Sequence, residues 1–169
     1  MLPRIPLVDD VRDFWKFSKT GRKLADLHID YEEIPPAPGV IVLYDKVLHD
    51  AINEAISNQE LESINYRVKK MRFPKKGQKD SIIYNSQITI TNIPQKAYEY
   101  IVNGKSAIEW IMERYQVKVD KKSGIKNDPN DWAIEHNNPK YILNLLLSVI
   151  NVSLQTVDLV NDLPELKFD

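Results

Sequence analysis

Apolar residues recur at three- and four-residue steps between residues 11 and 31. This spacing places them on one face of an amphipathic helix, and Asp9 and Asp10 are candidate capping residues at its start. Gly21 weakens the helix near its middle, because glycine is a poor helix former. The chain therefore opens with a helix of about six turns that has one face to bury.

A stiff linker and a short strand follow. The run IPPAPG at residues 34–39 predicts extended chain, since proline fixes the backbone and cannot continue a helix or a central strand. Val40 to Tyr44 has the composition of a short buried strand. Residues 48–62 have a helical composition.

Residues 65–91 predict a basic β-hairpin. The second arm, residues 81–91, is rich in β-branched residues, and residues 74–80 form a polar connection that contains a glycine. The first arm changes phase near residues 69–70, which predicts a bulge there. The apolar residues on either side of the change are Tyr66, Val68, Met71 and Phe73.

Two short helices are predicted after this hairpin. Pro94 suits a first helical position, and the helix that it opens, through Tyr98, Ile101 and Val102, is closed by Asn103-Gly104. Ser106 followed by Glu109 forms a capping box, which starts a second helix that runs to Tyr115.

The last third of the chain predicts a long loop and a long helix. Residues 118–138 are polar and have few apolar positions, so they form a loop of the kind that often carries function. Asn138-Pro139 then opens a helix with apolar residues on several faces as far as Val160, so it must be largely buried. The expected fold class is α+β. Residues 1–169 form one mostly helical domain with a basic hairpin or small antiparallel sheet and a long buried C-terminal helix.

Composition narrows the setting of this domain. The chain has 169 residues, enough for a single core, and no cysteine, which excludes disulfides and fits the reducing cytoplasm. We find neither a signal peptide nor a run of about 18 apolar residues that would span a bilayer. We therefore expect a cytoplasmic protein that does not contact membranes and is a monomer.

The charge distribution identifies the strongest functional candidate. The chain has a formal net charge of −1, yet residues 67–80, the basic segment, hold seven Lys or Arg against one Asp. Such a patch on a hairpin can meet phosphates along duplex DNA, and Asn85 and Gln87 on the second arm carry amides that suit adenine edges. Two alternatives remain, a solvated edge that prevents aggregation and a contact for an acidic protein surface. The basic candidates are Arg67, Lys69, Lys70, Arg72, Lys75, Lys76 and Lys79.

The long loop adds residues of the same kind. Its DNA-binding candidates are Lys118, Lys121, Lys122, Lys126, Asn127 and Asn130. The alternative is ordinary turn chemistry over residues 128–131, with Trp132 anchoring the loop to the core.

Catalytic motifs are absent. The histidines His28, His49 and His136 lie far apart and in no metal-ligand spacing, and the chain has no phosphate-binding loop, dinucleotide turn or nucleophile elbow. The run NPKY at residues 138–141 lacks the second proline of the amino-methyltransferase motif, and helix capping accounts for it. We predict no catalytic residue and no metal ligand.

Four segments resemble successive motifs of one family. They are RDFWKFSKTGRKLADLHIDYE, YRVKKMRF, SIIYNSQITITNIPQKAYEYIVNGKSAIEWIMERYQV and SGIKNDPNDWA. In this order they resemble the C-terminal target-recognition region of Type I single-polypeptide (type ISP) restriction-modification enzymes, which are large bacterial helicase-like proteins. The resemblance covers nearly the whole chain.

This resemblance implies a fragment that binds DNA for catalytic domains elsewhere. In that family one chain joins a nuclease, a helicase-like ATPase, a coupling segment and an adenine N6-methyltransferase to the recognition region. The start MLPRIP, residues 1–6, looks like the interior of such a chain. The implied partners are double-stranded DNA and other domains of the parent chain. ATP, magnesium and S-adenosylmethionine belong to the parent chain, and no cofactor is expected in this fragment. The alternative is a non-catalytic domain that docks on its neighbours, with the hairpin as an intramolecular contact.

We expect the isolated chain to show no ATPase, nuclease or methyltransferase activity, because none of the corresponding motifs is present. Assays on the purified chain with duplex DNA, ATP, magnesium and S-adenosylmethionine test this. ATP hydrolysis that a substitution in this chain abolishes would contradict it.

Overall fold

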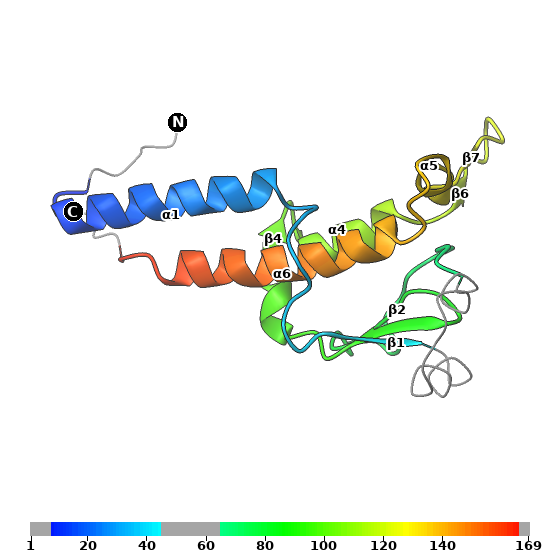
Figure 1. The fold of residues 1–169 in the computed structure, drawn as a ribbon, viewed down its shortest axis with the longest axis horizontal. Helices are drawn as coiled ribbons and strands as arrows, with labels where there is room; N and C mark the ends of the chain where they lie inside the picture. The colour runs from blue at the N-terminus through cyan, green and yellow to red at the C-terminus, as the bar shows by residue number, and fades with distance from the viewer. Residues whose placement is uncertain (1–7, 45–64, 166–169) are drawn as a thin grey trace.

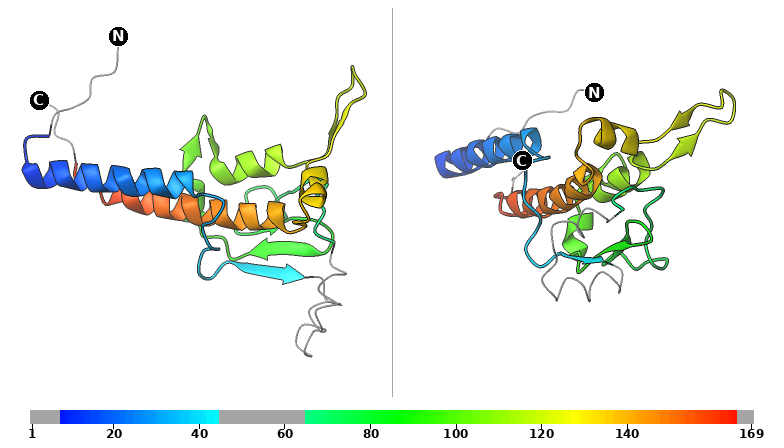
Figure 2. Two further views of the ribbon diagram at one scale, coloured as in Figure 1. Left: turned by 45° about the horizontal axis from the view of Figure 1, so that its top comes forward. Right: turned by 45° about the vertical axis from the view of Figure 1, so that its right-hand side comes forward.

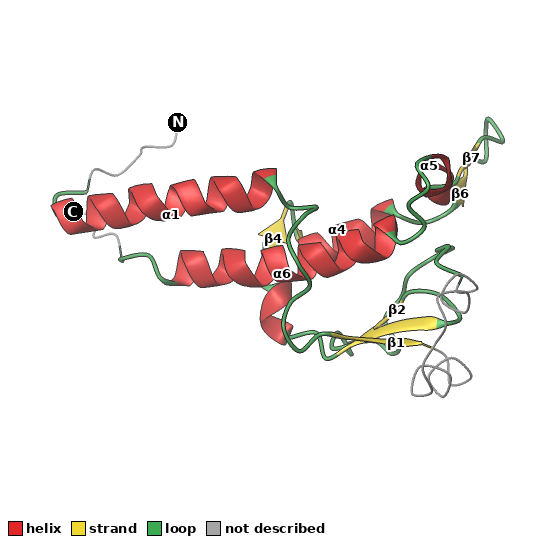
Figure 3. Cartoon of the chain, viewed as in Figure 1, coloured by secondary structure: helices red, strands yellow, loops and turns green. Residues whose placement is uncertain are grey.

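Two long helices dominate the computed structural model, which describes residues 8–44 and 65–165. Helix α1 (Val11–Ile29) runs beside the C-terminal half of α6 (Tyr141–Asn161), and the smaller elements surround the other half of α6 (Figures 1 and 2). Helices and short strands occur in one chain without a repeating β-α-β order (Figure 3), so the predicted α+β class is confirmed. The expectations for residues 1–6 and 48–62 lie outside the described residues.

Helix α6 is the core of the domain. Its residues Ile142, Leu146 and Ile150 are almost completely buried and belong to the same cluster as Ile90 and Ile108. Because apolar residues cover most of its circumference, neighbours pack on several sides of the helix. The prediction that this helix is largely buried is confirmed.

Polar residues on α6 fix the Pro-rich linker. The Ser148 hydroxyl donates to the carbonyl of Ile34 at 2.6 Å, and the Asn151 amide donates to the carbonyl of Pro35 at 2.7 Å. An extended chain leaves its carbonyls without strand partners, so buried side-chain donors must satisfy them. These hydrogen bonds hold the linker against α6, between α1 and the sheet.

Helix α6 is long and apolar enough to resemble a membrane-spanning helix. An 18-residue window has a mean hydropathy of 1.6, so by length and composition the helix meets the criterion for a membrane span. The expectation that no segment meets it was wrong. Since 61% of that window is buried inside the domain, its apolar side chains are used in the core. The helix also begins two residues later than predicted, with Lys140 rather than Asn138 at the N-cap.

Helix α1 confirms one prediction and corrects another. The Asp10 carboxylate accepts from the amides of Arg12 and Asp13, so it caps the helix as expected, and the helix continues through Gly21. Its apolar face is only partly used, because Phe14 and Trp15 are 55% and 54% exposed. The first half of α1 thus has an apolar face without a partner among the described residues.

A three-stranded antiparallel sheet packs on α6. The strands are β1 (Ile41–Tyr44), β2 (Ile82–Ile83) and β3 (Ile88–Thr91), and β3 lies in the centre. Alternate residues of β3, Ile88 and Ile90, point into the core. Strand β1 is a half-exposed edge strand rather than the buried strand predicted.

The segment after Pro94 differs from its prediction. A 3-10 helix, η1 (Gln95–Tyr98), is followed by a hairpin of β4 (Ile101–Val102) and β5 (Lys105–Ser106). Asn103 and Gly104 have φ values of 49° and 83° and form its turn, because this dipeptide favours two-residue hairpin turns. The predicted helix through residues 101–102 was therefore wrong. The capping box of Ser106 and Glu109 is confirmed at the start of α4 (Ala107–Arg114).

The long loop predicted for residues 118–138 contains regular structure. Strands β6 (Lys118–Val119) and β7 (Lys126–Asn127) form a hairpin, and α5 (Asn130–Glu135) follows it. The hairpin projects away from the rest of the domain, in yellow-green in Figure 2.

Replacing Leu146 by alanine should lower the free energy of unfolding by about 2–5 kcal/mol, because this fully buried side chain would leave a cavity in the core. Chemical denaturation measures the change. Val160→Ala is the control, since Val160 lies on the same helix but is 49% exposed and should change stability little. Equal stability of the Leu146 variant and the wild type would show that α6 is not the core.

Candidate nucleic-acid interface

The first arm of the basic segment is not a regular strand. Its link to the sheet is a single bridge, in which Arg72 and Ile83 exchange backbone hydrogen bonds of 3.1 and 2.9 Å. The regular hairpin is β2–β3, so the predicted bulged strand was wrong. The predicted change of phase is confirmed, because Val68 and Met71 are buried and both intervening lysines, Lys69 and Lys70, are exposed.

Asparagine side chains take the place of a partner strand. The Asn130 amide accepts from the backbone N–H of Val68 and donates to the carbonyl of the same residue, both at 2.8 Å. The Asn85 amide donates to the carbonyls of Asn65 and Arg67 at 2.7 and 3.1 Å. Since buried backbone groups need partners, these amides let an irregular segment pass beside the sheet.

The side-chain oxygens of Asn85 and Gln87 also make hydrogen bonds inside the domain. The Asn85 side-chain oxygen accepts from the amides of Gln87 and Ile88, both at 2.8 Å, and the Gln87 side-chain oxygen accepts from the amide of Asn65 at 3.2 Å. A base could bind the side-chain amide of Asn85 or Asn130, or the side-chain oxygen of Gln87, only if internal hydrogen bonds broke. The proposed base contacts of these three residues remain predictions that this geometry does not favour.

Asp128 joins the first arm to the β6–β7 hairpin. Its carboxylate accepts from the guanidinium of Arg67 at 3.1 Å, from the ammonium of Lys126 at 2.9 Å and from the side-chain amide of Asn130 at 2.6 Å. The side chain is only 4% exposed. Burial alone would raise the pKa of Asp128, but the hydrogen bonds from Lys126 and Asn130 outweigh it and lower the pKa to about 2.

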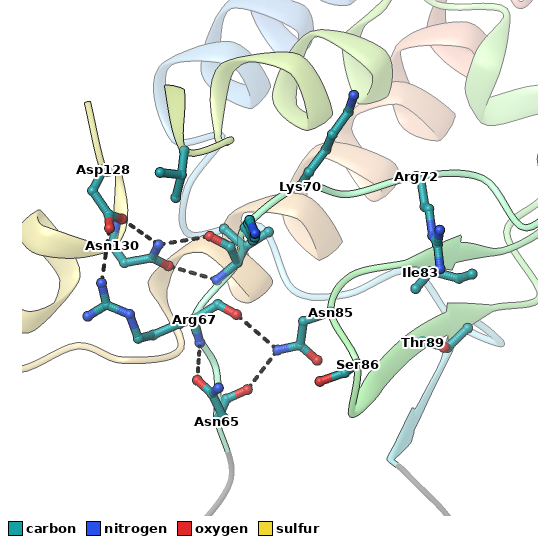
Figure 4. A pocket seen from close by; sticks show the side chains of 13 residues that line it. Asn65, Arg67, Lys70, Arg72, Ile83, Asn85, Ser86, Thr89, Asp128 and Asn130 are labelled. Carbon is teal, nitrogen blue, oxygen red and sulfur yellow. Dashed lines mark hydrogen bonds and ion pairs between the residues drawn. The ribbon is translucent and has the colours of Figure 1, made fainter. Parts of the chain in front are cut away.

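A cavity of about 910 Å³ opens beside this arm (Figure 4). Lys69, Lys70 and Arg72 line it, and Ile83 and Thr89 of the sheet contribute apolar surface. Val117, Asp128 and Asn130 line it as well, and they flank the β6–β7 hairpin. The hairpin therefore rises beside the cavity, and the two form one candidate interface.

The basic segment does not form a single patch. Lys75, Lys76 and Lys79 do not line the cavity. The Lys79 ammonium is 3.1 Å from the Glu109 carboxylate and lies over the ring of Tyr98, so it is used within the domain. Arg67 is paired with Asp128. Lys69, Lys70 and Arg72 have no acidic partner among the residues that the structure describes.

The residues predicted in the long loop also divide into exposed residues and residues that make contacts inside the domain. Lys118, Lys121, Lys122 and Asn127 are exposed on the hairpin, whereas Lys126 is paired with Asp128. The ring of Trp132 stacks on His136 at 4.1 Å and contacts Tyr141 at 4.4 Å, which favours its alternative role as an anchor. The nitrogens of His28 bond Leu24 and Tyr100, and His49 lies outside the described residues.

Comparison with known proteins gives a consistent result. Residues 1–145 match the model of the family described as the Type ISP C-terminal specificity domain. No curated protein matches the chain significantly. Among solved structures, an ATP-dependent Type ISP restriction-modification enzyme, LlaBIII, bound to DNA has a TM-score of 0.81 and 50% sequence identity over 99% of this chain and 10% of that one.

Two further structures are similar. A nuclease-deletion mutant of the Type ISP restriction-modification enzyme LlaGI, in complex with a DNA substrate mimic, has a TM-score of 0.80 and 50% identity over 99% of this chain. A DrdV–DNA complex has a TM-score of 0.68 and 25% identity over 98% of this chain. The chain spans 14% and 15% of these two relatives, so it corresponds to a small part of each.

Replacing Asp128 by asparagine should destabilise the domain on the order of 1–3 kcal/mol at neutral pH, because buried hydrogen bonds lose a charged acceptor. In the wild type the folded-state pKa of about 2 lies below the ordinary 3.8. The stabilisation by Asp128 is therefore complete above about pH 4 and is lost as the pH falls towards 2.

Denaturation between pH 5 and pH 2 should accordingly show a smaller loss of stability in the Asp128→Asn variant than in the wild type. Asp131→Asn is the matched control, because this carboxylate is 3.8 Å from Arg67 but 64% exposed. The same pH dependence in the wild type and the Asp128 variant would exclude the assigned role.

Proposed function

Because the chain belongs to the Type ISP C-terminal specificity domain family, we propose that it is a target-recognition domain that positions duplex DNA for catalytic domains outside this chain. The structures most relevant to this proposal, those of LlaBIII, LlaGI and DrdV, contain DNA or a DNA substrate mimic. Their similarity extends over 98–99% of this chain.

One observation supports the proposal most directly. Lys69, Lys70 and Arg72 line one open cavity and have no acidic partner among the described residues. The one carboxylate in the lining, Asp128, is already paired with Arg67 and Lys126. The cavity therefore presents positive charge to a ligand, although the chain as a whole has a net charge of −1.

Duplex DNA suits such a surface. Its phosphates place one negative charge about every 1.7 Å along the axis, so closely spaced lysines and arginines can meet several of them. These contacts orient the duplex and supply affinity without distinguishing sequences. The cavity thus has a positioning role, and sequence recognition requires additional groups that contact base edges.

The remainder of the proposed enzyme lies outside this chain. The chain spans 10–15% of the LlaBIII, LlaGI and DrdV chains, which leaves room for the catalytic domains. Binding of ATP, magnesium and S-adenosylmethionine is assigned to those domains, and this fragment acts without a cofactor as a cytoplasmic monomer.

A second function is supported by helix α1. Val11, Phe14 and Trp15 are exposed along its first half, which is unusual for an amphipathic helix of a complete domain. This face would suit a domain that docks on neighbouring parts of its parent chain. Salt dependence separates the two functions, since phosphate binding weakens steeply with salt whereas apolar docking does not.

Changing Lys69, Lys70 and Arg72 together to alanine should weaken binding to any duplex, because phosphate contacts are lost. The slope of log affinity against log salt should become shallower by about 0.9 per lost contact. Fluorescence anisotropy with a labelled duplex at several salt concentrations measures both quantities.

The control removes the same charge far from the cavity. Lys19, Arg22 and Lys23 lie on α1, so their triple change to alanine should leave the slope nearly unchanged. If the two triple variants behave alike, the cavity does not contact phosphates.

A further inference from the structure

The β6–β7 hairpin is held in shape by its own contacts. The Asp120 carboxylate accepts from the amides of Lys122 and Ser123 at 3.0 and 2.7 Å. The Asp120 backbone bonds both Gly124 and Ile125 at 2.9 Å, and Gly124 has a φ of 72° that suits glycine. An isolated two-stranded hairpin is marginally stable, so this ordered tip and the link from Lys126 to Asp128 give it support.

The ordered hairpin leaves its side chains uncovered. Every residue from 118 to 127 is exposed, and Val119 and Ile125 are 59% and 67% exposed. The hairpin projects beyond α5 in each view (Figures 1 and 2). A projecting ribbon with apolar and basic side chains has a surface suited to contact with another molecule.

The strand register assigns these side chains to two faces. Lys118 pairs with Asn127, and Val119 pairs with Lys126. Because side chains alternate along a strand, Lys118 and Asn127 share one face, and Ile125 lies on it two residues before Asn127. Lys126 lies on the opposite face, where it is bonded to Asp128.

Asn127 differs from the other amide candidates. The side chains of Asn85, Gln87 and Asn130 all make hydrogen bonds inside the domain. Asn127 is exposed and its side-chain amide has no hydrogen bond among the described residues. A free amide of this kind can donate to N7 of adenine and accept from its N6 amino group, so its best-matched partner is the N6/N7 edge of adenine.

The dimensions of DNA decide which groove fits. The major groove is about 12 Å wide and admits a two-stranded ribbon, whereas the minor groove is only about 6 Å wide. A two-stranded ribbon that lies lengthwise in the major groove turns one of its faces towards the base edges. A hairpin beside the phosphate-binding cavity can therefore enter the major groove of the same duplex.

We infer that the β6–β7 hairpin enters the major groove of the bound duplex, with Asn127 contacting an adenine edge and Ile125 a thymine methyl group. This inference rests on the proposed function and adds the sequence-determining residues to it. The exposed lysines of the hairpin, Lys118, Lys121 and Lys122, contact the phosphates on either side of the groove.

The test begins with a selection. The 169-residue chain is used to enrich duplexes from a random-sequence library, and the enriched duplex is then made with single base analogues. Replacing an adenine by 7-deazaadenine removes N7, and replacing a thymine by uracil removes the methyl group. Both changes alter only the major groove, so each probes one proposed contact.

Asn127→Ala should bind the enriched duplex about 5- to 150-fold more weakly, with an unchanged salt slope, since one base contact is lost. Replacing one adenine by 7-deazaadenine should weaken the wild type but have no further effect on this variant. Ile125→Ala should lose the sensitivity to uracil at one position in the same way.

Matched controls are available on the same chain. Asn161→Ala and Ile134→Ala change exposed residues of α6 and α5 and should keep the sensitivity to both analogues. Circular dichroism and thermal unfolding compare the fold of all four variants.

The outcomes separate the inference from the proposed function. If the wild type binds with a steep salt slope but neither analogue couples to Asn127 or Ile125, the inference is wrong and the proposed function stands. If the chain binds no duplex at low salt, both are wrong.

Discussion

The domain depends on side-chain amides that replace a strand. Residues 65–70 carry buried side chains into the core but pair with no strand in the described part of the chain. Asn130 pairs with both backbone groups of Val68, and Asn85 bonds two more carbonyls, so the segment is fixed without regular pairing. The same segment can then expose two successive lysines, which a regular strand would send to opposite faces.

The contacts that stabilise this segment also decide which basic side chains stay unpaired. Asp128 holds Asn130, Arg67 and Lys126 together, so the arm and the base of the β6–β7 hairpin share one buried carboxylate. This pairing uses two of the basic side chains, whereas Lys69, Lys70 and Arg72 have no acidic partner among the described residues. The positive charge of the cavity therefore depends on which basic residues form ion pairs inside the domain and which do not.

Elements with several agreeing signals could be predicted from sequence. The apolar circumference of α6, the capping box of Ser106 and Glu109 and the change of phase near residues 69–70 were all correct. Asn103-Gly104 was assigned wrongly because the same dipeptide ends helices and turns hairpins, and only tertiary pairing decides between them. Asn85 and Asn130 were proposed to contact DNA because an amide suited to a base suits a backbone equally well. Their internal hydrogen bonds depend on residues some 20 and 62 positions away, which local patterns do not show.

Helix α6 connects the two ends of the domain mechanically, because different elements pack on its two halves. One half of α6 lies against α1, the other half carries the sheet and α5, and Ser148 and Asn151 clamp the chain between them. With 21 residues the helix is about 31 Å long, so a tilt of about 10° at one end moves the other by roughly 5 Å. A partner bound to α1 that tilted α6 by this angle would displace the β6–β7 hairpin, beside the opposite end of α6, by a similar distance (Figure 1).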